Sequence, residues 1–128
     1  MATIIPAQPK AAVTPPRFEF LDLTQAQDIA SNAEQLRELM QTFEVSLSEE
    51  IAKINRALAA QDPAAMEFSL HTLKGFMGIF VVPSLALQVD RLYKNCRHQP
   101  LAHTSHEFNA LVPSFQTLLS EVRGWLSL

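Results

Sequence analysis

Hydrophobic residues recur every three or four positions through most of the chain after residue 17. This spacing puts them on one face of an α-helix, and such a face packs against a core. Four long helices are predicted in this way, over about residues 31–60, 63–80, 84–99 and 104–126. The stripe in the first of them consists of Leu36, Leu39, Met40, Phe43, Leu47, Ile51, Ile54 and Leu58.

Residues that favour helix ends separate these stripes. Asp62 before Pro63 is a strong helix start, because the carboxylate accepts from free N–H groups and proline at the first position loses no bond. Pro83 and Pro100 separate neighbouring helices, and Pro113 is predicted to kink the last one. Three pairs have the spacing of a capping box and are predicted to open helices: Thr24 with Gln27, Ser31 with Glu34, and Thr104 with Glu107.

Four long amphipathic helices with short connections predict an all-α fold, an antiparallel four-helix bundle. A short helix at about residues 24–31 precedes it. Residues 1–17 hold four of the eight prolines and show no apolar period. They are interpreted as a disordered, proline-rich flexible tail, or as a linker cut from a larger protein, preceding one helical domain over residues 18–128.

Composition narrows the class of protein. With 48% hydrophobic residues in 128, the chain can bury a core without metals or disulfides. A net charge of −3 argues against nucleic-acid binding, which needs a basic face. The single cysteine, Cys96, fits a reducing cytosol and is predicted to be a buried small side chain on an apolar stripe. No apolar run is long enough to insert into a membrane and no signal peptide is evident, so a cytoplasmic location is expected by default.

The segment that carries candidate chemistry spans residues 70–78 and reads Leu-His-Thr-Leu-Lys-Gly-Phe-Met-Gly. On a helix, one narrow stripe forms its core face: Met66, Leu70, Leu73, Met77 and Phe80. The opposite face carries Glu67, His71, Lys74, Gly75 and Gly78. His71 is therefore predicted to be exposed to solvent.

Two glycines follow His71 on its own surface stripe, at Gly75 and Gly78. A glycine inside a helix costs about 1 kcal/mol relative to alanine, so a pair on one face needs a reason. One reason is clearance, which lets a partner protein approach the imidazole in the in-line geometry that attack on phosphorus requires. The alternative is close packing of the glycines against a neighbouring helix.

Two charged residues lie one helical turn on either side of the histidine. Lys74 can place its ammonium near an incoming phosphoryl group. Glu67 can accept from the imidazole Nδ1–H, which would leave Nε2 as the free nucleophile. The alternative for both side chains is simple solvation at the surface.

The residues His71-Thr72-Leu73-Lys74-Gly75 resemble the signature of histidine-containing phosphotransfer (Hpt) domains. The pattern of a short helix followed by a four-helix bundle, with the motif on the second long helix, is similar to that family over about residues 24–126. The resemblance implies that His71 takes a phosphoryl group from a receiver-domain aspartate and gives it to another receiver. It also implies that Lys74 faces the phosphate and that Gly75 provides access.

The resemblance further implies a phosphocarrier rather than an enzyme. The expected partners are receiver domains or a hybrid sensor histidine kinase. Mg²⁺ is expected on the receiver and no cofactor in this chain, which is expected to be a monomer. Phe68 and Ile79 flank the site and either pack on a neighbouring helix or form the apolar docking patch.

Some positions differ from the family pattern. Leu70 stands where alanine is frequent, Phe76 and Met77 where small polar residues are usual, and Val81 where another glycine is usual. These differences motivate an alternative function, a bundle that binds a receiver or kinase without being phosphorylated. A third hypothesis, zinc bound by His98, His103 and His106, is weak because their spacing fits no familiar site, so no metal is predicted.

Overall fold

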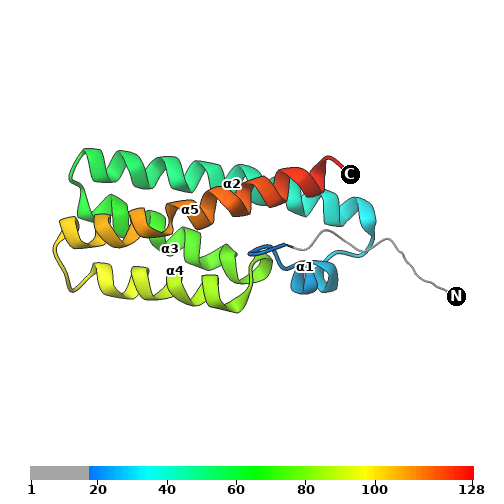
Figure 1. Ribbon diagram of the computed structural model, residues 1–128, viewed down its shortest axis with the longest axis horizontal. Helices are drawn as coiled ribbons and strands as arrows, with labels where there is room; N and C mark the ends of the chain where they lie inside the picture. The colour runs from blue at the N-terminus through cyan, green and yellow to red at the C-terminus, as the bar shows by residue number, and fades with distance from the viewer. Residues whose placement is uncertain (1–17) are drawn as a thin grey trace, which may run out of the picture.

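The computed structural model describes residues 18–128, and five helices account for most of them (Figure 1). They are α1 (Thr24–Ile29), α2 (Ala33–Ala59), α3 (Pro63–Phe80), α4 (Pro83–Cys96) and α5 (Leu101–Leu126). The predicted all-α fold, a four-helix bundle after a short first helix, is confirmed. The flexible tail predicted for residues 1–17 lies outside the described residues.

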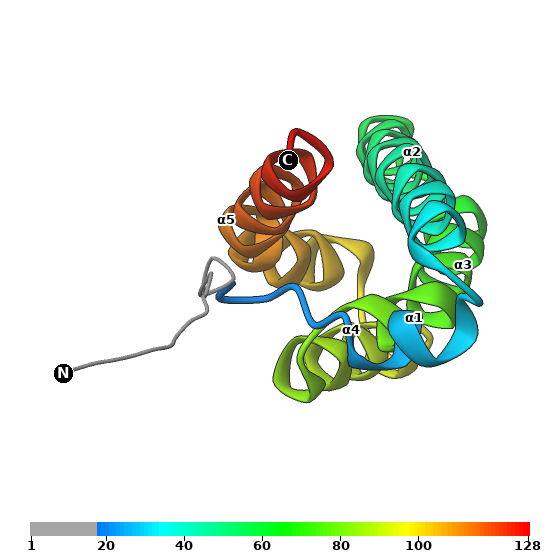
Figure 2. The ribbon, with the colours of Figure 1, turned by 90° about the vertical axis from the view of Figure 1, so that its right-hand side faces the viewer.

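The four long helices surround a common core when the molecule is viewed along its length (Figure 2). Helix α2 packs on α3 and α5, and α4 packs on the same two neighbours from the other side. The short helix α1 lies against α3 and α2 at one end of the bundle. No helix within residues 18–128 combines the length and apolar character that crossing a bilayer would require.

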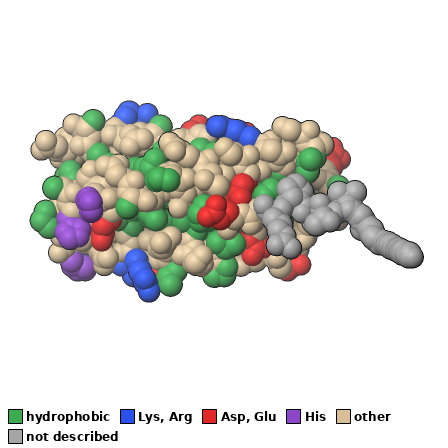
Figure 3. Space-filling model, viewed as in Figure 1, with side chains coloured by type: hydrophobic (Ala, Val, Ile, Leu, Met, Phe, Trp, Pro, Cys, Tyr) green, Lys and Arg blue, Asp and Glu red, His purple; other side chains and the backbone are tan. Residues whose placement is uncertain are grey.

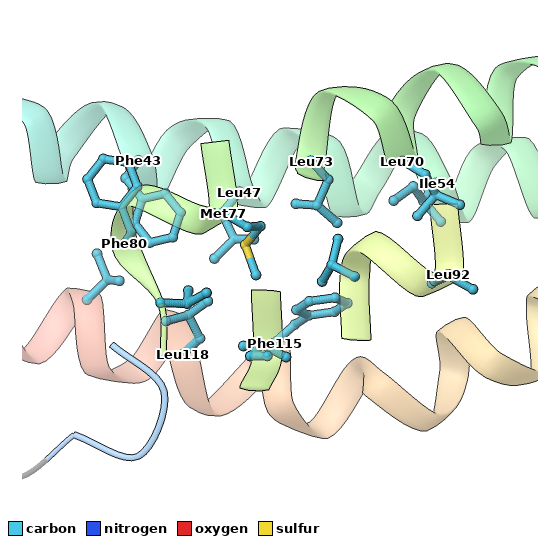
Figure 4. Close-up of a cluster of buried hydrophobic side chains, with 14 of the residues drawn as sticks. Phe43, Leu47, Ile54, Leu70, Leu73, Met77, Phe80, Leu92, Phe115 and Leu118 are labelled. Carbon is cyan, nitrogen blue, oxygen red and sulfur yellow. The ribbon is translucent and has the colours of Figure 1, made fainter. Parts of the chain in front are cut away.

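The core is built from the predicted stripes. The core face expected for α3 is buried throughout, and no member exposes more than 4% of its surface. Figure 4 shows these side chains meeting those of the other long helices, with Phe43 stacked on Phe80 at 4.1 Å between ring centroids. Each such residue contributes about 1.5–3 kcal/mol to folding when it leaves water.

Helix α3 begins as predicted, whereas the cap of α2 lies one residue later than the predicted Ser31. At α3, Asp62 Oδ1 accepts from the backbone N–H of Ala65 at 3.1 Å. At α2 the cap is Asn32, whose Oδ1 accepts from the Gln35 N–H at 2.8 Å, while the Gln35 side chain accepts from the Ser31 N–H. Both Ser31 and Asn32 are good capping residues, and the shift by one replaces the predicted pair with an equivalent one.

The capping boxes predicted at Thr24 and Thr104 are wrong. Thr24 is the first residue of α1, and its N–H donates to Asp22 Oδ1 at 3.0 Å, a bond that lowers the pKa of the Asp22 carboxyl. Helix α5 begins three residues before Thr104, which is buried inside it. The Gln99 side-chain amide donates to the oxygens of both predicted partners, Thr104 and Glu107. The helix continues through Pro113, which is exposed.

Residues 18–22 form a segment, here called the N-terminal strap, that ties the start of the domain to its last helix. Leu21 makes an isolated antiparallel bridge with Val81, in the turn between α3 and α4. The Glu121 carboxylate of α5 accepts from the backbone N–H groups of Phe20 and Leu21, each at 3.0 Å, and from that of Glu19. One carboxylate therefore satisfies three backbone donors of the strap.

Substitution of Glu121 by glutamine is expected to destabilise the domain by about 1–3 kcal/mol, because a neutral amide cannot replace an ionised acceptor for three donors. Urea unfolding followed by circular dichroism measures the loss. The matched control is Glu44→Gln, which removes the ion pair of Glu44 with Arg123 (2.7 Å). The arginine of that pair is largely exposed, so its loss should cost about 1 kcal/mol or less. Equal effects of the two substitutions would contradict the role given to Glu121.

Candidate functional site

His71 lies on the exposed face of α3, as its helical phase predicts. Its neighbours at positions 70 and 73 point into the core and are fully buried. The helix therefore holds the imidazole at the surface, while the opposite side of the same helix is fixed by packing. This is an arrangement in which a side chain is accessible to a partner without being on a flexible loop.

The surface beside His71 is open at both glycines. A Cβ atom added at Gly75 or at Gly78 would meet nothing within 4 Å. Close packing against a neighbouring helix is therefore excluded as the reason for these glycines. No contact within the protein offsets the free-energy cost of two glycines in a helix. Their effect is to leave the imidazole open to approach from outside.

Helix α4 supplies an aromatic neighbour for the histidine. The ring centroids of His71 and Tyr93 are 5.3 Å apart, with the planes tilted by 53°. The Lys74 ammonium lies 5.3 Å from the centroid of the same tyrosine ring. Lys74 and His71, one turn apart on α3, therefore both border Tyr93.

The Lys74 ammonium is directed toward α4. Its Nζ lies 3.6 Å from Asp90 Oδ1, and the other oxygen of that carboxylate is 2.9 Å from Lys94 Nζ. The hydrogen bond from Lys94 is the main cause that lowers the pKa of Asp90, and Lys74 adds to it. Asp90 is thus an ionised partner shared by two lysines.

The role predicted for Glu67 is corrected by the structure. Its Oε2 accepts from Arg97 Nε at 2.9 Å and forms no hydrogen bond with His71. Arg97 Nη2 also donates to the Tyr93 hydroxyl at 2.7 Å. The Glu67 carboxylate therefore forms a charge-assisted bond with the guanidinium at the end of α4 and not with the imidazole on its own helix.

The two apolar residues predicted to flank the site differ in exposure. Phe68 exposes 69% of its surface and lines a hollow of about 460 Å³ together with His71, Tyr93 and Arg97. Ile79 is half-buried and packs against the core. It borders a second hollow, of about 530 Å³, that also includes Gly78 and the exposed Leu87.

Cys96 is half-buried rather than buried. It lies at the end of α4, where its Sγ donates to the Tyr93 carbonyl oxygen at 3.0 Å. Burial is the main cause that raises the pKa of the thiol, and the nearby Glu67 carboxylate adds to it. The thiol therefore stays protonated at neutral pH and is a poor nucleophile.

The later histidines do not form a metal site in the described part of the chain. His98, His103 and His106 are exposed, and histidines gather at the end of the molecule where α4 leads to α5 (Figure 3). His103 lies 3.7 Å from a Glu107 oxygen. Residues 18–128 contain no group of three or more His, Cys, Asp or Glu side chains that could hold a metal ion.

Comparison with protein families gives one match. The family model for the Hpt domain matches residues 38–125, which include α3, α4, most of α2 and nearly all of α5. This chain belongs to the Hpt domain family. No curated protein sequence and no solved structure matches it. Hpt domains are phosphotransfer modules of two-component signalling that interact with receiver domains and kinases.

The positions at which this Hpt domain departs from the family pattern point inward. Leu70 and Met77 are fully buried, and Val81 exposes 4%. Phe76 is half-buried, and its ring meets that of Phe43 edge-on with centroids 5.8 Å apart. These side chains therefore pack toward the core and not onto the face that carries His71.

The site of this Hpt domain also includes Asp90 and Tyr93 of α4 and Arg97, which directly follows that helix, and none of the three is among the predicted site residues. Tyr93 is partly buried and packs in part against the hydrophobic core. The sequence does contain a signal for this set, because spacings of three and four residues put the three side chains on one face of a helix. The rotation of α4 against α3, which periodicity does not determine, brings that face to His71.

Proposed function

We propose that this Hpt domain carries a phosphoryl group on His71, between a donor receiver domain and an acceptor receiver domain in a multistep phosphorelay. The observation that carries the proposal is an exposed imidazole on a rigid helix, with open space over the two glycines beside it. An imidazole nitrogen forms the bond to phosphorus while the bond from phosphorus to the aspartyl oxygen breaks and the carboxylate leaves. The same exchange runs in reverse when the phosphoryl group passes on.

Lys74 is proposed to stabilise the transferred group. Its ammonium is partly exposed, and its distance of 3.6 Å from Asp90 is long for an ion pair. Asp90 keeps its closer partner, Lys94, at 2.9 Å, so Lys74 can turn to a phosphoryl oxygen without leaving the carboxylate unpaired. Charge-assisted bonds from an ammonium to phosphoryl oxygens offset the lost contact.

The partner in this proposal is a receiver domain, which brings the aspartyl phosphate and Mg²⁺. The contact is transient, so a small interface is sufficient. Phe68 and Leu87, two of the large hydrophobic residues that are exposed in residues 18–128, line the hollows on the two sides of the site and are proposed as docking contacts. We propose that this exchange takes place in the cytoplasm and that the chain acts as a monomer. The phosphoryl group is proposed to originate from the histidine kinase system.

Replacement of Phe68 by serine is expected to weaken receiver binding about ten-fold, because an exposed aromatic side chain is a typical interface anchor. Since the ring is 69% exposed, the melting temperature should stay close to that of the unsubstituted protein. Titration of the receiver by isothermal calorimetry measures the change. Val45→Ser, on α2 with 54% exposure, is the control. An equal loss in both variants would argue against docking through Phe68.

The proposed function is tested by incubating the protein with phosphorylated receiver domains of its source organism. Phosphohistidine is expected to give a label that is stable in alkali and lost in acid. Receiver binding without any transferred label would reject the proposal in favour of the alternative, an interaction module that is not phosphorylated. The inward orientation of the family departures gives that alternative no support at the exposed face.

A further inference from the structure

We propose that Tyr93 is a positioning residue, whose ring holds the His71 imidazole in one orientation for phosphoryl transfer. This inference rests on the proposed function of His71 and adds to it a residue from another helix. The ring centroids lie 5.3 Å apart with a tilt of 53°, within the range in which aromatic pairs attract each other. Both side chains line the same hollow.

Tyr93 is itself held on three sides. Part of its ring packs against the hydrophobic core. Arg97 donates to its hydroxyl at 2.7 Å and places its guanidinium carbon 5.2 Å from the ring centroid. Arg97 is in turn bonded to Glu67 of α3 at 2.9 Å. The ring is therefore tied to the helix that carries the histidine as well as to its own.

The Tyr93 ring also contacts Lys74. Lys74 Nζ lies 5.3 Å from the Tyr93 centroid, at the range of a cation–π contact. His71 and Lys74 thus contact the same fixed tyrosine ring, although the ends of both side chains are exposed to solvent. A shared contact limits the range of spacings between the nucleophile and the cation, whereas free surface side chains would vary independently.

The expected size of the effect follows from the number of rotamers. A histidine on an exposed helix face has about two accessible χ1 wells and a broad, roughly two-fold χ2. Loss of the aromatic contact therefore spreads the imidazole over about four orientations, of which one is productive. The rate of transfer should fall about four-fold from this cause, and up to about ten-fold once the lysine is also released.

The test compares Tyr93→Leu, which removes the ring, with Tyr93→Phe, which keeps the ring and removes the hydroxyl. Initial rates of labelling from a phosphorylated receiver are expected to fall about four- to ten-fold in Tyr93→Leu and to stay within about two-fold in Tyr93→Phe. Thermal melting establishes that both variants fold, and Tyr93→Met replaces the leucine variant if that one does not. An unchanged rate in Tyr93→Leu, or an equal loss in both variants, overturns the proposal.

A second readout does not depend on phosphorylation. The ring current of Tyr93 should shift the His71 imidazole proton resonances in the NMR spectrum of the intact protein, in Tyr93→Phe as well, and the shift should vanish in Tyr93→Leu. Imidazole shifts that are identical in all three proteins overturn the positioning role. If the shifts behave as expected while the unsubstituted protein takes no label, the failure lies in the proposed function, and the positioning role for transfer falls with it.

Discussion

Replacing His71 by glutamine is expected to abolish the acid-labile label, to below about 1% of that of the unsubstituted protein, because the amide has no lone pair basic enough to attack phosphorus. Glutamine is similar in size and polar, and position 71 is exposed. The free energy of unfolding should therefore change by no more than about 0.5 kcal/mol. Labelling from a phosphorylated receiver and urea unfolding of the same preparation measure the two quantities.

Two further histidine variants make that experiment specific. His98→Gln and His106→Gln remove exposed imidazoles that lie far from α3 in the chain, between α4 and α5 and within α5, and both should label normally. Receiver binding by the His71 variant should stay within a few-fold, since the docking contacts proposed for Phe68 and Leu87 are intact. A label that survives in His71→Gln, or that is lost in either control, would place the phosphoryl group on another residue.

Replacing Gly75 by leucine is expected to have opposite effects on stability and on transfer. A Cβ at this position meets nothing, and leucine is a better helix former, so the domain should gain about 0.7 kcal/mol. The same side chain stands one turn from His71, in the space that the partner's phosphoryl group must enter. A displacement of the reacting atoms by about 1 Å can cost about a hundred-fold in rate, and a loss of that order is expected.

The matched control for this substitution is Gly124→Leu in α5. Gly124 is the third glycine of the chain and lies outside the site, and a Cβ there is equally unobstructed. Its substitution should leave the transfer rate unchanged. Single-turnover labelling by rapid quench, together with thermal melting, separates the two effects. A Gly75→Leu protein that is more stable and transfers at the normal rate would remove access as the reason for the glycine.

The sequence predicts the end of a helix correctly where adjacent residues alone determine it. Asp62 followed by Pro63 offers one way to begin a helix, and α3 begins there. Ser31 and Asn32 are adjacent residues that cap equally well, so the pattern alone does not select between them. Thr104 has the spacing of a cap, but α5 starts three residues earlier and draws its hydroxyl into the interior, where Gln99 binds it. Tertiary packing accounts for the case of Thr104, which is fully buried.

The site was predictable to the extent that it lies on one helix. The phase of α3 placed His71 and its glycines outward, because a buried stripe on one side determines the opposite side. The pairing of Glu67 with Arg97 and the contact of His71 with Tyr93 join α3 to α4. Such contacts depend on how two helices are rotated and translated against each other, and sequence periodicity carries no information on either quantity.

The N-terminal strap has a practical consequence for how this domain should be delimited. The family match begins at residue 38, whereas the strap ends at Asp22. A fragment trimmed to the matched range would lose two backbone hydrogen bonds of 2.8 Å. In one, the Asp22 N–H donates to the Phe80 carbonyl, and in the other, the Val82 N–H donates to the Phe20 carbonyl. It would also deprive Glu121 of its three donors. Expression boundaries chosen from the family match alone would thus remove stabilising contacts at the end of α3, the helix that carries His71.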